Sequence, residues 1–146
     1  MPALIGGEKL AKVLAEIGSN MEGSVSVGFL GGATYPDGTS VAQVAFWNEY
    51  GTTRIPPRPF FRTMIANESP GWGVLMQKAA KHYEYNGDTV LQFMGVKIAE
   101  QLQQSIAGWQ TPANSAFTIA AKGFNKPLID TGQMQNSVDF EVNTSA

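Results

Sequence analysis

The motif Asp130-Thr131-Gly132 is the best candidate for catalysis in this sequence, because it follows the apolar pair Leu128-Ile129. In retroviral-type aspartic proteases two such aspartates share a proton, and a homodimer can supply the second one. That pattern continues with a small residue and several strands, whereas Gln133 and a short run of chain follow the motif here. The alternative is a turn in which Asp130 caps a short helix from Thr131 to Asn136. We favour the turn.

Other residues with catalytic or metal-binding chemistry are scattered. His82 is the only histidine and the chain has no cysteine, which excludes thiol nucleophiles, zinc-thiolate sites and disulfides. A lone imidazole without a carboxylate cluster is a poor metal site. No G-x-S-x-G elbow presents a serine to His82, and no phosphate-binding pattern follows Gly31-Gly32. The sequence therefore predicts no enzyme activity, no metal and no cofactor.

The arginines of a proline-rich stretch are a second set of residues that could bind a partner. Arg54, Arg58 and Arg62 lie in a run from Tyr50 to Asn67 that contains no carboxylate. We name Arg54 to Arg62 the strut, because its prolines fix φ and keep the residues before them out of the helical region. A stiff, exposed segment loses little entropy on docking and is suited to meet a partner. The alternative is a simple connector with solvated charges.

Composition narrows the class of protein. The 146 residues are enough for one domain with its own core, and we treat 1–146 as a single domain. Charged residues make up 15%, against about 25% in typical soluble domains, which favours a surface partly covered by other subunits. The net charge of -2 gives no basic field for nucleic acid. No apolar run reaches the roughly 20 residues of a membrane span, so we expect no membrane partner.

Hydrophobic periodicity predicts the elements of the first half. Glu8 to Met21 has an apolar stripe at helical spacing, and Ser24 to Leu30 alternates as a strand does. Val41 to Tyr50 should be a helix, which Gly51 ends because glycine tolerates the left-handed conformation.

The second half is predicted to be mostly helical. We expect one helix from Phe60 to about Asn67 and another from Pro70, since proline starts helices more readily than it continues them. The longest helix should run from Thr89 to Trp109 with Asp88 as its cap. Val138 to Val142 alternates as a last strand that pairs with the first one. These elements predict an α+β fold: a small antiparallel sheet packed with several helices, one of them long and amphipathic, and extended loops.

Three blocks of the chain occur in a recognisable order. The first is VAFWNEYGT at 44–52 with IPPRPFFR at 55–62. The second is Trp109 with PANS at 112–115 and Thr118-Ile119, and the third is KGFNKPLIDTGQMQNS at 122–137. This succession resembles the small neck and tail-completion proteins of tailed bacteriophages, the minor tail or head-tail joining components. With the helices between them, the blocks span about two thirds of the chain.

The resemblance implies an α+β structural protein of the virion that forms a ring where the capsid connector meets the tail, without catalysis. A hexamer is the first expectation and a dodecamer the second, because such rings match the symmetry of the tail. The implied partners are head-completion or connector proteins and tail-terminator or tail-tube proteins, with genome DNA passing nearby without specific binding. The protein would be found in the neck or tail, and in the host cytoplasm during assembly.

Closing a ring requires a heterologous contact, in which two different patches of the chain meet. We expect the strut to be one patch and the segment Thr111 to Gly132 to be the other. The residues predicted to contact a subunit or partner are Trp47, Glu49, Tyr50, Arg54, Pro56, Pro57, Arg58, Pro59, Phe60, Arg62, Lys126, Leu128, Asp130, Thr131 and Gly132.

The sequence leaves three rival functions open. A nucleic-acid-associated phage assembly protein would place the arginines against DNA, and a hydrolytic one would depend on Asp130. A cellular binding module could share the strut by chance. A salt-dependent shift on DNA, an activity lost on changing Asp130, or the absence of rings in electron micrographs would separate these.

Overall fold

The computed structural model describes residues 6–110, 112, 114, 118–119, 128 and 132–144. Within these residues it contains five helices and a two-stranded antiparallel sheet, which confirms the predicted α+β fold class. In chain order the elements are α1 (Gly7–Asn20), β1 (Ser24–Gly28), α2 (Val41–Tyr50), α3 (Phe60–His82), α4 (Gly87–Gly108), α6 (Gln133–Asn136) and β2 (Asp139–Asn143). None of the described helices combines the length and the apolar character that crossing a membrane requires.

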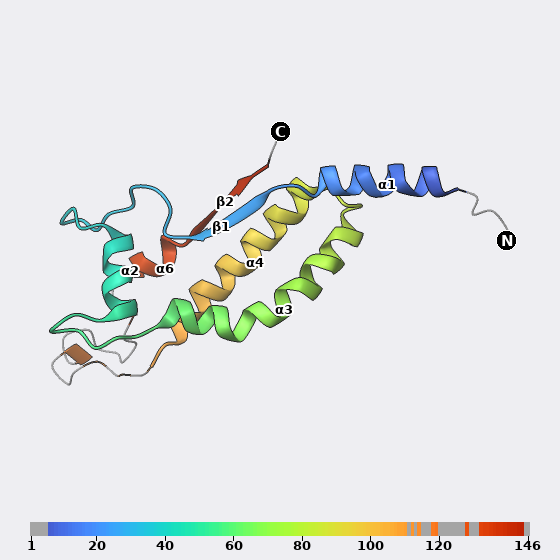
Figure 1. Ribbon diagram of the computed structural model, residues 1–146. Coiled ribbons are helices and arrows are strands. Elements are labelled where there is room, and N and C mark those ends of the chain that lie inside the picture. The colour runs from blue at the N-terminus through green and yellow to red at the C-terminus, as the bar shows by residue number, and fades with distance from the viewer. Residues whose placement is uncertain are drawn as a thin grey trace.

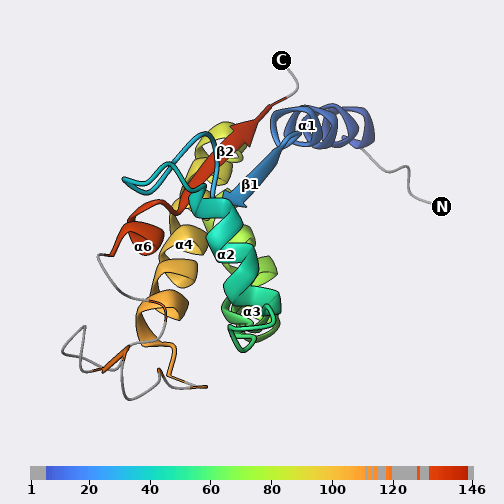
Figure 2. The same ribbon diagram turned by 90° about the vertical axis from the view of Figure 1, so that its left-hand side faces the viewer.

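The sheet pairs the first strand of the chain with the last. β1 and β2 run antiparallel, with Val25 opposite Val142 and Val27 opposite Phe140, so the predicted pairing of the first and last strands is confirmed. These apolar residues share one face of the sheet, because side chains alternate along a strand. That face packs against α4, as Figures 1 and 2 show.

α4 is the centre of the core. Its predicted apolar stripe is confirmed, since Met94, Leu102 and Ile106 are completely buried. α3 lies alongside it (Figure 1) and contributes Phe60 and Met64 to the cluster that holds Leu102 and Ile106. The predicted cap is wrong: the side chain of Asn86 accepts the Thr89 N–H at 3.1 Å, and Asp88 lies in the first turn of the helix. Asn86 takes this position because its backbone is extended just before the helix begins.

α3 is one helix of 23 residues where the sequence predicted two, and it is one residue longer than α4, which has 22. Pro70 lies inside it, and Figure 1 shows that the helix is bent. A proline removes one helical hydrogen bond and costs about 3 kcal/mol. Packing on both sides of Pro70 offsets this cost, since Met64 before it and Ala79 after it are both buried. Tertiary contact thus overrides the local signal for a break.

The contact between α4 and the sheet depends on Gly95, because a Cβ at this position would overlap the ring of Phe140. We expect Gly95→Ala to lower the free energy of unfolding by about 1–3 kcal/mol through overpacking. Gly73→Ala is the control, since a Cβ at Gly73 meets nothing within 4 Å. That change should raise stability by about 0.5–1 kcal/mol, because alanine favours a helix interior over glycine. Urea unfolding measures both, and equal effects of the two changes would contradict this packing.

Candidate interaction surface

The predicted contact residues of the first half gather where α2 meets α3. Trp47, Glu49 and Tyr50 lie in the second half of α2, while Phe60 and Arg62 lie in the first turn of α3. The other strut residues connect the two helices without regular secondary structure, as the sequence predicted. One junction therefore holds most of the predicted site.

The carboxylate of Glu49 is the chemical centre of this junction. Glu49 is only 5% exposed, and its two carboxylate oxygens accept the backbone N–H groups of Phe61 at 2.9 Å and of Arg62 at 3.1 Å. The Arg62 side chain adds an ion pair of 2.8 Å from Nε to the same carboxylate. The first N–H groups of a helix lack partners within it and attract negative charge. Since Pro59 at the N-cap makes no side-chain bond, Glu49 caps α3 from α2.

Arg58 departs from the expectation of an exposed strut. It is only 7% exposed, its backbone N–H donates to the Asn48 carbonyl at 2.6 Å, and its Nε donates to the Pro112 carbonyl at 2.9 Å. Burial lowers the pKa of Arg58, although an arginine remains charged at neutral pH. The physical reason is that the guanidinium can satisfy backbone carbonyls inside the fold. Arg54, Pro56 and Pro57 are exposed as predicted.

The strut folds back onto the end of α2. Gly51 ends that helix, as predicted, with φ of 78°, and a Cβ there would approach the Ile55 carbonyl oxygen and the Pro57 nitrogen at 2.9 Å. The Thr52 N–H donates to the Ile55 carbonyl at 2.8 Å, and its hydroxyl accepts the Ile55 N–H at 3.0 Å. The position therefore favours glycine, which tolerates this conformation without strain.

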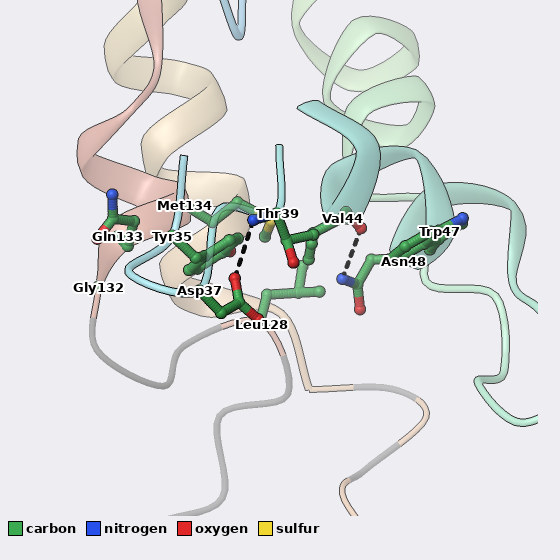
Figure 3. Close-up of a pocket in the computed structure, with 10 residues that line it drawn as sticks. All are labelled: Tyr35, Asp37, Thr39, Val44, Trp47, Asn48, Leu128, Gly132, Gln133 and Met134. Atoms are coloured by element: carbon green, nitrogen blue, oxygen red, sulfur yellow. Dashed lines mark hydrogen bonds between the residues drawn. The ribbon is translucent and has the colours of Figure 1, made fainter. Parts of the chain in front are cut away.

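The two patches predicted from the sequence adjoin within a single chain. Figure 3 shows an open pocket of about 400 Å³ in which Trp47 of α2 lies with Leu128 and Gly132. The bond from Arg58 to Pro112 makes a second connection. The remaining predicted contacts, Lys126, Asp130 and Thr131, lie outside the described residues. The predicted cap at Asp130 is wrong, because the short helix α6 begins only at Gln133 and has Gly132 at its N-cap. The described parts of the two predicted patches are thus connected within one chain, and their contacts with other copies stay a prediction.

Polar groups that line this pocket form hydrogen bonds within the chain. The Thr39 N–H donates to the Asp37 carboxylate at 2.9 Å, which lowers the pKa of Asp37 and fixes the turn between β1 and α2. The Asn48 side chain donates to the Val44 carbonyl at 2.9 Å (Figure 3), and Gln133 of α6 donates to the Thr34 carbonyl at 2.9 Å. Among the described residues no group of three or more acidic residues, histidines or cysteines could hold a metal ion.

An apolar groove of about 330 Å³ lies between α2 and α3, and its lining includes Glu49 and Arg62. We name it the aromatic groove. Its rim is formed by Phe46 and Tyr50, which are 56% and 54% exposed, and by Ile65, which is 40% exposed. The Phe46 and Tyr50 rings lie 4.8 Å apart, and the Arg62 guanidinium carbon lies 4.7 Å from the centre of the Tyr50 ring. Large apolar side chains gathered in this way mark an interaction surface.

α1 carries a second exposed apolar surface, although it forms the helix that the sequence predicted. None of its residues is buried, and Leu10 and Leu14 are each 58% exposed, with Val13 at 43%. Figure 1 shows α1 extending from the end of the molecule opposite α2. Its C-terminal end is fixed, because a Cβ at Gly87 would overlap the Asn20 carbonyl. α1 is therefore an arm that is anchored at one end.

Sequence reasoning found only part of this surface. It selected Trp47 and Tyr50 but not Phe46 or Ile65, whose exposure depends on how α2 packs against α3. The face of α1 had a usable signal: a clear apolar stripe in a chain with few charges. Periodicity identifies such a face but does not say whether its partner belongs to the same chain.

Comparisons with known proteins add no identification, since no protein-family model matches the chain and neither a curated protein nor a solved structure is significantly similar to it.

Removing the Glu49 carboxylate should loosen the start of α3. We expect Glu49→Ala to lower the free energy of unfolding by about 2 kcal/mol, mostly through the two uncapped N–H groups, because the partly exposed Arg62 ion pair adds little. The control is Glu100→Ala, whose side chain is 51% exposed and lies 3.7 Å from Lys97. It should change stability by less than about 0.5 kcal/mol. Urea unfolding compares the variants, and equal losses would refute the capping role.

Proposed function

We propose that this protein is a structural subunit of a homo-oligomeric ring. The observation that carries the proposal is the pair of exposed apolar surfaces, one on α1 and one at the aromatic groove. Monomeric proteins rarely leave such surfaces open, whereas subunits of assemblies bury them between copies. The low charge content supports the same conclusion.

The sequence blocks that resemble phage neck and tail-completion proteins suggest where such a ring works. On this proposal the ring lies at the head-tail junction of a tailed bacteriophage and joins the connector to the tail. Its axial partners are head-completion or connector proteins on one side and tail-terminator or tail-tube proteins on the other. The role is mechanical and needs no catalytic group.

The surroundings of the strut favour protein contacts over DNA contacts. Binding DNA requires cationic groups that reach the phosphates. Of the three strut arginines, Arg58 is buried and Arg62 is shared between the Glu49 carboxylate and the Tyr50 ring, so only Arg54 is exposed without such partners among the described residues. Passage of the genome through the ring would then proceed without specific binding.

The wild-type protein at high concentration should sediment as a closed oligomer, with a hexamer expected first, and should give rings in negative-stain images. Phe46→Ser combined with Tyr50→Ser should abolish these rings while the far-ultraviolet circular dichroism stays unchanged. Val74→Ser is the control, because Val74 is 55% exposed on α3 and does not line the aromatic groove. It should form rings as the wild type does. A wild-type protein that is monomeric at every concentration would contradict the proposed function.

A further inference from the structure

The two exposed apolar surfaces lie at opposite ends of the molecule. α1 and α2 are separated by the length of the sheet and α4 (Figures 1 and 2). Asn20 is held against Gly87, and the arm starts at the end of the sheet that is distant from α2 (Figure 1). The arm of one molecule therefore does not reach its own groove, and each surface needs a partner from outside the chain.

The apolar residues of the two surfaces have the same spacing. Leu10 and Leu14 are four residues apart on α1, a rise of about 6 Å along the helix. The groove has the same repeat on both walls, since Phe46 and Tyr50 are four apart on α2, as are Phe61 and Ile65 on α3. Ridges of residues spaced by four pack into grooves of the same spacing. Laying an amphipathic helix into such a groove is a common mode of recognition.

Charge does not oppose this contact. The charged residues of α1 are Glu8, Lys9, Lys12 and Glu16, so the arm has no net charge. The charges of the groove are those of Glu49 and Arg62, which neutralise each other. Docking thus buries no uncompensated charge, which is the most costly feature an interface can have.

We propose that α1 of one copy docks in the aromatic groove of the next copy, with Leu10, Val13 and Leu14 against Phe46, Tyr50 and Ile65. This inference rests on the proposed ring and names its contact. Pairing two α1 helices would stop at a dimer and leave both grooves open. One heterologous contact covers both surfaces and repeats from copy to copy, and such a contact forms a ring when the rotation between copies closes.

The limited area of the contact also favours a closed ring. A stable interface buries about 800 Å² on each partner, and three side chains of the arm supply only part of that. In a ring every copy makes the contact twice, as donor and as acceptor, and the contacts hold one another in place. A single pair of copies would dissociate readily.

Cysteine cross-linking tests the contact directly, because the natural chain has no cysteine. One preparation carries Leu14→Cys and a second carries Ile65→Cys; the two are mixed under mild oxidation and the covalent dimer is quantified. The control mixture replaces Leu14→Cys with Lys12→Cys, which lies on the polar face of the arm. We expect several-fold more dimer from the first mixture than from the control or from either preparation alone. Leu10→Cys with Phe46→Cys should repeat the result.

Three outcomes would overturn the contact. Strong cross-linking of Leu14→Cys with itself would mean that the arms pair with each other. Equal yields with Leu14→Cys and Lys12→Cys would mean that the arm has no preferred face. If rings form but Leu14→Cys does not cross-link to Ile65→Cys, this contact is wrong and the proposed function still stands. If no oligomer forms, both the contact and the proposed function are wrong. Circular dichroism confirms that each variant is folded.

Discussion

The bonds between the Glu49 carboxylate and the first turn of α3 fix the geometry on which the rest of the surface depends. They replace the missing cap of α3 and hold the end of α2 beside it. Tyr50 follows Glu49 directly, and Arg62 reaches both the carboxylate and the Tyr50 ring. One buried acidic side chain therefore positions both walls of the aromatic groove, and its burial is satisfied by hydrogen bonds from N–H groups.

The elements that could be predicted from the sequence are those that a local pattern of residues determines. The paired strands, the stripe of α4 and the end of α2 at Gly51 each follow from periodicity or from a residue with special backbone freedom. The continuous helix through Pro70 could not be predicted in this way, because packing along its length outweighs the cost of the proline. The burial of Arg58 depends on Pro112, which is distant in the sequence.

The candidate surface could likewise be predicted from the sequence only in part. Trp47 and Tyr50 were selected from the sequence and belong to the block at 44–52 that resembles the phage proteins. The sequence also assigned the strut and the segment Thr111 to Gly132 to separate patches, and the bond from Arg58 to Pro112 connects the two within one chain. We propose α1 as the surface that complements the groove; its apolar stripe is visible in the sequence, and its exposure is visible only in the fold.

Hydrogen-deuterium exchange measured over a dilution series tests the central claim most directly. If α1 and α2 are covered by neighbouring copies, the backbone amides of both helices should exchange slowly at high protein concentration and faster, together, as the assembly dissociates. Amides of α4, which lies in the core of each subunit, should be unaffected and serve as the internal reference. Exchange in α1 and α2 that is independent of concentration, in a sample that sediments as an oligomer, would contradict the account.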